Sequence, residues 1–228
     1  MTDFHSHILP GMDDGASNVE ESVEMLRMSA LQGVNKVFLT PHFYADEESP
    51  SDFLRRREAS FAELRSALSD ADFAVPELCL GAEVYYFPGL SECEEIRALE
   101  MEGTGLLLVE PPMIPWTQAM LGDIRACRET LGLVPVVAHV DRYCRMLRDR
   151  GLFDRLSDEN IPAQVNASFF LRHASRRWAM RLLHDGAIHF LGSDCHNTEQ
   201  RPPNLGAASF VIAEAGQQSA LRRLMRQK

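Results

Sequence analysis

Several features that mark large classes of protein are missing from this sequence. The five cysteines are odd in number and scattered, and no Cys-x-x-Cys pair occurs, so neither a zinc ribbon nor a disulfide framework is expected. The longest apolar runs, such as 105–109 and 134–138, fall far short of the roughly 20 residues that span a bilayer. The N-terminus lacks the basic and apolar segments of a secretory signal. We therefore expect a cytoplasmic protein without membrane insertion.

Positive charge is also scarce. The chain has 23 Lys and Arg residues against 33 Asp and Glu residues, which gives a formal net charge of −10. A general nucleic-acid binder needs the opposite balance, so no nucleic-acid partner is expected. The 228 residues are 45% apolar and 25% charged, and they contain no repeat or low-complexity tract. These values are typical of globular proteins, and we predict one domain over 1–228.

Apolar runs rich in β-branched residues alternate with helical patterns, which predicts an α/β fold with a parallel sheet. Strands are predicted over 4–7, 36–41, 77–84, 105–110, 134–139, 162–166 and 188–194. Helices are predicted over 18–32, 51–68, 91–99, 117–131, 142–156, 171–184 and 204–226. Asn18 or Ser17 is expected to cap the first helix, and Gly33 to end it. Periodicity alone is compatible with an open sheet or a closed barrel.

Six of the seven predicted strands end in metal-binding side chains: His5 and His7, His42, Glu83, Glu110, His139, and Asp194 with His196. The members of the first and last pairs are two residues apart, which places both on one face of a strand. If the sheet closes, the first and last strands become neighbours and the pairs meet at the mouth where barrel enzymes have their active sites. The spacing of these pairs therefore favours a closed barrel over an open sheet. His189 lies in the same predicted strand as Asp194 but an odd number of residues before it, so its side chain is expected to face away from the site.

The candidate ligands also indicate the kind of metal. A single histidine at a strand end is more often structural than a ligand, but five histidines and three acids at strand ends are hard to explain by chance. Imidazole and carboxylate without thiolate suit Mn²⁺, Fe or Zn²⁺. Nine ligands are too many for one ion and predict two or three ions, with a bridging carboxylate, in a site suited to phosphate ester hydrolysis. The nine are His5, His7, Asp14, His42, Glu83, Glu110, His139, Asp194 and His196.

A phosphate group needs further cationic partners and a pocket. Arg142 and Arg201 lie shortly after candidate ligands, and both could hold phosphoryl oxygens bidentately. Tyr44, Tyr85 and Tyr86 also follow candidate ligands and could line an aromatic pocket, although rim packing is the commoner role of any single tyrosine. His42 and Asp194 are candidate proton donors to a leaving oxygen.

Six segments resemble, in order and spacing, the motifs of one known family. They are DFHSHILPGMDDGA at 3–16, TPH at 40–42, GAEVYY at 81–86, VE at 109–110, HVDRY at 139–143 and GSDCHN at 192–197. The chain resembles the PHP-superfamily protein-tyrosine phosphatases of bacterial capsule and exopolysaccharide operons, of the CpsB/YwqE (CapC) type. The opening motif is specific, whereas the later ones are weak singly and strong together.

The resemblance implies a distorted (β/α)₇ barrel, similar to a TIM barrel, with a trinuclear and usually Mn-dependent site. It implies that the nine candidate ligands bind metal and that Arg142 and Arg201 bind phosphate. It also implies hydrolysis, by a metal-bridging hydroxide, of phosphotyrosine on the C-terminal tail of a polysaccharide-assembly tyrosine kinase. The chain departs from the family pattern at Ser6, at 140–141 and at Cys195, and Pro111-Pro112 after Glu110 bears on the choice of substrate.

Three alternatives remain open. A thiol phosphatase is suggested by Cys-x₅-Arg at Cys144–Arg150 and Cys195–Arg201, but neither loop has the glycines of a phosphate cradle. The second alternative is a metal phosphoesterase that has the same site but acts on a small phosphomonoester, such as histidinol phosphate. A regulator without activity would have no need of nine ligands.

Overall fold

The computed structural model describes residues 1–224, so the predicted end of the last helix at residue 226 lies outside the described residues. The strands are β1 (Thr2–Asp3), β2 (Lys36–Leu39), β3 (His42–Phe43), β4 (Glu77–Leu80), β5 (Glu83–Tyr85), β6 (Leu106–Glu110), β7 (Val134–Val137), β8 (Gln164–Asn166) and β9 (Phe190–Gly192). The α-helices are α1 (Val19–Leu31), α2 (Pro50–Ala67), α3 (Gln118–Thr130), α4 (Val140–Met146), α5 (Leu152–Asp158), α6 (Ser168–Leu171), α7 (His173–His184), α8 (Leu205–Glu214) and α9 (Gln218–Leu224). Three short 3₁₀ helices are η1 (Leu68–Asp70), η2 (Leu90–Glu92) and η3 (Glu94–Leu99). Among the described helices, none has the length and apolar content needed to cross a membrane.

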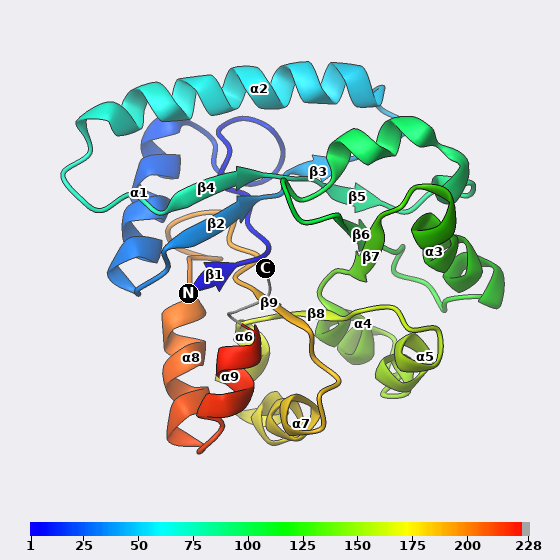
Figure 1. Ribbon diagram of the computed structural model, residues 1–228. Helices are drawn as coiled ribbons and strands as arrows, with labels where there is room; N and C mark the ends of the chain where they lie inside the picture. The colour runs from blue at the N-terminus through cyan, green and yellow to red at the C-terminus, as the bar shows by residue number, and fades with distance from the viewer. Residues whose placement is uncertain (225–228) are drawn as a thin grey trace.

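The strands pair in parallel, in the orders β1-β2-β4, β3-β5-β6-β7 and β8-β9. Only two residues, Thr40 and Pro41, separate β2 from β3, and only Gly81 and Ala82 separate β4 from β5. Each of these pairs is therefore one strand with a break. Figure 1 shows the strands at the centre of the molecule and the helices around them. The predicted α/β class is confirmed.

Further parallel contacts join the three sheets into a circuit. Val137 bridges to Ala163 just before β8, and Ser6 bridges to Cys195 just after β9. Asp194 donates its backbone N–H to the carbonyl of His5 at 2.8 Å, so the first and last segments are neighbours. Counting each broken strand once, the pairings pass through seven segments and return to the first. This connectivity is that of the predicted (β/α)₇ barrel, distorted at the two breaks.

The inside of the circuit holds its own apolar cluster. Its members include Phe4, Phe38, Cys79, Leu108, Val136 and Phe190, each from a different strand segment. The Phe4 ring stacks on Phe38 with centroids 5.5 Å apart and meets Phe190 edge-on at 4.9 Å. Neighbouring strand residues of the opposite parity belong to the larger core beneath the helices. Burial on both faces explains why the strands read as continuous apolar runs, and the inner cluster forms the floor of the site described below.

The helix signals of the sequence are largely confirmed, with four corrections. The first is that the helix predicted over 204–226 divides into α8 and α9 around Gly216, which has a φ of 77°. Asn18 caps α1 by accepting the backbone N–H of Glu21 at 2.9 Å, and Gly33 follows the helix with a φ of 80°. The predicted helix over 91–99 is wrong, because this segment forms the short 3₁₀ turns η2 and η3. The predicted helix over 142–156 divides into α4 and α5 at a loop where Arg148 has a φ of 54°. The helix predicted over 171–184 begins at His173, after the separate turn α6.

The first predicted strand is also corrected. The β1 ladder ends at Asp3, whereas the prediction covered 4–7. Beyond it, residues 4–7 remain extended but lie between two neighbours, with His7 donating its N–H to the carbonyl of Cys195 at 2.9 Å. Ser6 donates its hydroxyl to the carbonyl of Phe38 at 2.8 Å. The side chain of Ser6 therefore faces away from its neighbours His5 and His7.

A half-buried carboxylate on α3 holds the turn before η2 against that helix. Asp123 accepts hydrogen bonds from the backbone N–H groups of Gly89 (2.9 Å) and Ser91 (3.1 Å), from the Ser91 hydroxyl (2.6 Å) and from the Tyr86 hydroxyl (3.1 Å). Burial opposes ionisation of Asp123, but these hydrogen bonds outweigh it and lower the pKa of the carboxyl.

We expect Asp123→Ala to lower the free energy of unfolding by about 3 kcal/mol at pH 7, because several donors lose a charged acceptor. A lowered folded-state pKa stabilises the protein above the unfolded-state pKa of about 4, and this contribution is lost as the pH falls through the lower folded-state value. The deficit of the variant should therefore shrink toward pH 3. Urea unfolding across this range measures it, with the exposed Asp70→Ala as control. A deficit that does not vary with pH contradicts this account.

Candidate metal centre

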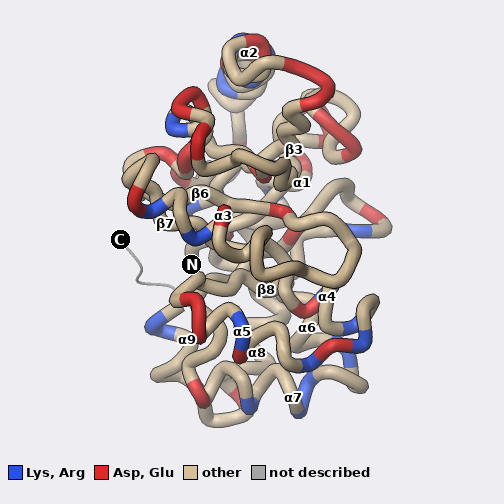
Figure 2. The backbone as a smooth tube through the Cα atoms, turned by 90° about the vertical axis from the view of Figure 1, so that its right-hand side faces the viewer, with Lys and Arg blue, Asp and Glu red and all other residues tan. Residues whose placement is uncertain are grey.

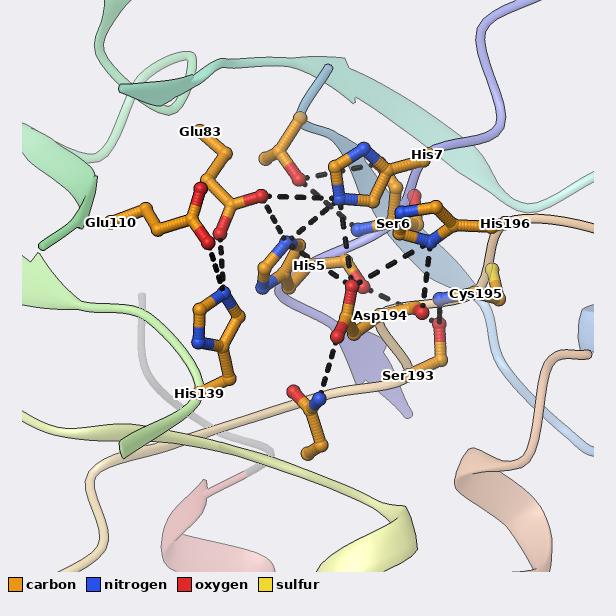
Figure 3. Close-up of polar contacts among 12 residues, drawn as sticks. His5, Ser6, His7, Glu83, Glu110, His139, Ser193, Asp194, Cys195 and His196 are labelled. Atoms are coloured by element: carbon orange, nitrogen blue, oxygen red, sulfur yellow. Dashed lines mark hydrogen bonds and ion pairs between the residues drawn. The ribbon is translucent and has the colours of Figure 1, made fainter. Parts of the chain in front are cut away.

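The predicted ligands converge at the carboxyl ends of the strands, around the Glu83 side chain (Figure 3). Glu83 Oε2 lies 3.1 Å from His5 Nε2, 3.2 Å from His7 Nε2 and 3.2 Å from His42 Nδ1. Its other oxygen, Oε1, lies 2.8 Å from His139 Nε2. These side chains, except that of His42, are essentially inaccessible to solvent. One carboxylate thus reaches four imidazoles from three different strand segments, which is the geometry expected of a bridging ligand.

The other candidate acids lie around the same imidazoles. Asp194 Oδ1 lies 3.7 Å from His5 Nε2 and 3.6 Å from His7 Nε2. Glu110 contacts the opposite side of the cluster, with Oε2 at 3.5 Å from His42 Nδ1 and Oε1 at 3.3 Å from His139 Nε2.

Asp14 closes the open side of the cluster. Its Oδ1 lies 3.2 Å from His196 Nε2 and 3.8 Å from His42 Nε2, and its side chain is two-thirds exposed. The structure therefore places all nine predicted residues in one cluster.

Three overlapping groups within this cluster have the donor spacing of a metal site. They are His5, His7 and Glu83; His42, Glu83 and Glu110; and His7, Asp14, His42 and His196.

The unsatisfied polar atoms of the cluster fit bound cations. Among the described residues, His42 Nδ1, Glu83 Oε1 and both ring nitrogens of His139 are buried without a hydrogen bond of acceptable geometry. Buried polar atoms normally have partners, because leaving them unpaired costs roughly 1–3 kcal/mol each. Nitrogen and carboxylate oxygen without sulfur form a donor set suited to Mn²⁺, Fe or Zn²⁺. The residues present therefore fit divalent cations.

The electrostatics of the cluster agree with this fit. Burial disfavours the charged forms of both His7 and His139, but nearby carboxylates outweigh it: Asp13 and Glu83 raise the pKa of His7, and Glu83 and Glu110 raise that of His139 to about 10. Glu83 shows the reverse, because the surrounding histidines hold its pKa well below the usual value against the effect of burial. The carboxylates thus stabilise positive charge in the cluster, and either bound protons or metal ions can supply it. Metal binding should therefore release protons.

Backbone strain occurs at two of the candidate ligands. His139 has a φ of 31° and Asp194 a φ of 53°, in the left-handed region that side chains other than glycine rarely adopt. Each conformation costs of order 1–3 kcal/mol and persists only where the surroundings enforce it. Here the surroundings are the backbone hydrogen bonds of each residue: His139 N–H donates to Gln164 Oε1, and Asp194 N–H donates to the His5 carbonyl. The strain aims both side chains into the cluster.

Two supporting residues were not predicted. Asp13 Oδ2 lies 2.7 Å from His7 Nδ1 and accepts the backbone N–H of His42 at 2.8 Å, so it fixes the ring of one candidate ligand and the backbone of another. Asn166 donates to Asp194 Oδ2 at 2.6 Å. Partners of this kind orient the ligands of metal sites and raise their basicity. The sequence signal for Asp13 was its place beside Asp14 in the opening motif, whereas Asn166 carried no signal.

Two glycines allow this close packing. A Cβ on Gly15 would lie 2.2 Å from the carbonyl oxygen of His7, and a Cβ on Gly192 would lie 2.5 Å from the Cβ of His5. Neither approach is possible for a larger residue. The loop after His7 can therefore fold back over the cluster, and β9 can lie directly against His5.

The two predicted arginines line one cavity beside the cluster. This cavity, here called the site cavity, has a volume of about 330 Å³ and is also lined by Asn166 and Asp194. Arg201 Nη2 lies 2.7 Å from Asp194 Oδ1, and Arg142 Nη1 lies 3.9 Å from Glu110 Oε1. Both side chains are about 40% exposed, at 39% for Arg201 and 41% for Arg142, so their free N–H groups are accessible from the cavity.

Of the three tyrosines that were predicted to line an aromatic pocket, two lie at the site. The Tyr44 ring stacks on His42 with centroids 5.3 Å apart, and Tyr85 lies 5.4 Å from Tyr44. Tyr86 points the other way, because its hydroxyl donates to Asp123 on α3. The prediction that Tyr86 lines the pocket is therefore wrong, whereas Tyr44 and Tyr85 are placed to do so.

The segment after Glu110 packs away from the site. The carbonyl of Pro111 accepts a hydrogen bond of 2.5 Å from the hydroxyl of the buried Tyr143. The Trp116 ring meets Tyr143 edge-on, with centroids 4.9 Å apart. The hydrogen bond to Pro111 thus fixes the start of this loop against α4.

The cysteines do not form a nucleophilic site. Burial raises the pKa of Cys144 to about 12 and raises that of Cys195 as well, whereas a thiol phosphatase needs a thiolate at neutral pH. The remaining histidines lie elsewhere. His189 accepts the N–H of Ala163 just before β8, at the end of the strands remote from the cluster, as its parity predicted. His173 and His184 begin and end α7, both exposed.

Comparison with known proteins gives consistent results. A family model described as capsular polysaccharide synthesis, CpsB/CapC, matches residues 1–228. The chain is 30% identical to the tyrosine-protein phosphatase CpsB of Streptococcus pneumoniae over 230 residues, which cover 94% of this chain and 90% of that protein. It is 28% identical to the tyrosine-protein phosphatase YwqE of Bacillus subtilis strain 168 over 224 residues, which cover 93% and 84%.

A solved structure has the same fold. It comes from work on YwqE of B. subtilis and CpsB of S. pneumoniae, described as unique metal-dependent tyrosine phosphatases, and it matches this chain with a TM-score of 0.82 at 23% identity. The match covers 100% of this chain and 96% of the solved one.

Proposed function

Because this chain belongs to the CpsB/CapC family of capsular polysaccharide synthesis, we propose that it is a metal-dependent protein-tyrosine phosphatase. The observation that carries the proposal is the convergence of nine histidine and acid side chains from successive strand ends around Glu83. Its relatives named above are tyrosine-protein phosphatases. The two arginines beside this cluster supply the contacts that a phosphoryl group needs.

We propose that two or three divalent ions, with Mn²⁺ the first choice, bind the nine residues. Glu83 would hold more than one ion, because its two oxygens face different imidazoles. Asp14, His42 and His196 form the outer group, on the side where Asp14 is exposed. Ions bound here would acidify a coordinated water and neutralise charge on the phosphoryl oxygens.

The residues of the chain then have distinct roles. Arg142 and Arg201 hold the phosphoryl oxygens in the site cavity and stabilise the charge that develops during hydrolysis. Asp194 positions Arg201 through the 2.7 Å contact. Tyr44 and Tyr85 contact the phenyl ring of the substrate at the mouth of the site.

The leaving tyrosyl oxygen needs a proton. Of the two candidates, Asp194 is the poorer donor, because His5, His139 and Arg201 hold its pKa below the usual value despite its burial. His42 lies at the accessible side of the cluster, 12% exposed and stacked on Tyr44. Both ring nitrogens of His42 face other candidate ligands, and neither candidate can donate a proton while it binds metal. We therefore assign His42 and Asp194 to the ligands alone, and the leaving oxygen takes its proton from water at the open side of the cluster.

The proposed substrate is the phosphotyrosine-bearing tail of a bacterial tyrosine kinase that serves polysaccharide assembly. The five cysteines of this chain are all free, as expected of a protein in a reducing compartment. We place the protein in the cytoplasm on these grounds.

The test is an assay of metal-stripped protein on a phosphotyrosine peptide and on histidinol phosphate, with Mn, Fe, Zn or Mg added back singly. We expect turnover of the peptide to return with one or more of these ions and to exceed that of histidinol phosphate. The opposite preference would identify a small-molecule phosphoesterase on the same site. No turnover of either substrate with any of the ions would refute the proposed activity.

A further inference from the structure

A second cavity adjoins the site cavity on the side of α4 and α7. This second cavity, here called the arginine cavity, also has a volume of about 330 Å³. The two cavities share Asp141, Arg145 and Arg172 as lining residues, so they lie side by side. Arg148 and Arg150 line only the arginine cavity.

The lining of the arginine cavity is strongly positive in a protein of net charge −10. Its four guanidinium groups belong to Arg145, Arg148, Arg150 and Arg172, all exposed, and within residues 1–224 none of them forms an ion pair with a carboxylate. Figure 2 shows basic segments gathered around α4, α6 and α7.

The acids near these arginines are already engaged. Asp141, the acid in the lining, is buried, and its Oδ1 accepts the backbone N–H of Asn166 at 2.9 Å. Asp149, between Arg148 and Arg150 in the sequence, pairs instead with Arg155 at 2.8 Å. Elsewhere on the surface, arginines such as Arg27 and Arg55 are paired with neighbouring acids. The positive charge of the arginine cavity is therefore free to meet a ligand.

The arginine cavity also has an aromatic wall. Trp178 is half-buried, and the guanidinium carbon of Arg150 lies 5.2 Å from the centre of its ring. The Phe169 ring meets Trp178 edge-on at 5.4 Å, which holds the indole in place. An anionic side chain with an apolar or aromatic stem fits such a lining, with the stem on the wall and the charge among the arginines.

We propose that the arginine cavity is a second anion subsite, which binds an acidic or phosphorylated side chain of the same peptide whose phosphotyrosine occupies the site cavity. The inference rests on the proposed function and adds a substrate class to it: peptides with a second negative charge near the scissile phosphotyrosine. The shared lining of the two cavities places the second charge close to the scissile phosphotyrosine, and the arginines, which form no ion pair within residues 1–224, supply the affinity. Glutamate and phosphotyrosine share the required chemistry, and the test separates them.

The experiment compares three peptides and one small substrate on the metal-loaded enzyme. The peptides carry one phosphotyrosine flanked by glutamines, the same phosphotyrosine flanked by glutamates, or two phosphotyrosines; the small substrate is p-nitrophenyl phosphate. The test variant is Arg148→Gln/Arg150→Gln, which changes the arginine cavity alone. The control is Arg177→Gln/Arg181→Gln, which removes the same charge from exposed positions of α7 outside both cavities.

We expect the wild type to prefer a charged peptide over the glutamine-flanked one by roughly tenfold or more in kcat/KM, mainly through KM. The test variant should lose most of that preference and retain its activity on p-nitrophenyl phosphate within about twofold, while the control keeps the preference. A preference for the doubly phosphorylated peptide alone identifies a phosphate subsite, and an equal preference for glutamates identifies a general acidic subsite. The absence of a preference in the wild type, or equal losses in the test and control variants, overturns the inference. Failure to hydrolyse any of the four substrates would instead refute the proposed function.

Discussion

Replacement of Glu83 by glutamine is expected to abolish turnover while leaving the fold intact. The variant should lose at least roughly 10³-fold in kcat/KM on a phosphotyrosine peptide, because loss of residues that merely support metal ligands already costs about 10–100-fold. Glu83 contacts His5, His7, His42 and His139 at 2.8–3.2 Å, so all the groups of the cluster that include it lose charge and a donor. Bound metal, measured by mass spectrometry on the same samples, should fall with the activity.

The control for this experiment is Glu94→Gln, an isosteric change at an exposed position of η3. It should retain the metal content and the activity of the wild type. Circular dichroism of both variants tests that the fold is kept. A Glu83→Gln protein that binds metal normally and turns over at the wild-type rate contradicts the central place given to this carboxylate.

Replacement of Arg201 should produce the second largest loss, of a different kind. We expect Arg201→Ala to lower kcat/KM by roughly 10²–10³-fold, the usual cost of removing one preorganised donor to a developing oxyanion, without loss of bound metal. Arg201 is held firmly in position, because its side chain contacts Asp194 and its backbone N–H donates to Asn197 Oδ1 at 2.9 Å.

Two companion variants distinguish phosphate binding from a structural role. Arg201→Lys keeps the charge but not the bidentate fork, so it should restore only part of the activity. Arg181→Ala removes an exposed arginine of α7 and should leave turnover unchanged. If Arg201→Ala stays within about threefold of the wild type, the assignment of this residue to the phosphoryl group fails.

The residues of the site could be predicted more completely than the bounds of the strands and helices that carry them. His5, Glu83 and His139 are far apart in the sequence, but Glu83 and His139 follow short apolar runs and His5 follows Phe4. In a closed parallel sheet the carboxyl ends of all strands meet. The step-of-two pairs at 5–7 and 194–196 then indicated that the first and last segments are neighbours. The contacts of Ser6 with Cys195 and of Asp194 with His5 confirm that neighbourhood.

What the sequence could not show depends on tertiary contacts and backbone strain. The positive φ of His139 ends β7 at Val137, earlier than the apolar run suggests, and α4 follows directly. The hydrogen bonds to Asp123 hold the start of 91–99 in short 3₁₀ turns where the local pattern suggests a helix. Asp13 and Asn166 act through hydrogen bonds to residues distant in the sequence, and no spacing rule detects such partners.

The wrong prediction that Tyr86 lines the aromatic pocket also has a physical reason. It follows the strand that carries Glu83, as Tyr85 does, but successive residues of an extended segment point to opposite sides. Tyr85 therefore reaches Tyr44 at the site, while Tyr86 reaches Asp123 on α3. Parity distinguishes the two tyrosines once the break between β4 and β5 fixes which side faces the site.

The most direct test of the central claim is anomalous diffraction from crystals of the protein loaded with Mn²⁺. The account predicts two or three anomalous peaks within coordination distance of the cluster, with Glu83 shared between peaks and Asp14, His42 and His196 around the outermost one. A map in which the metal lies elsewhere on the protein, or in which no ion contacts Glu83 in a fully loaded and active crystal, would contradict it.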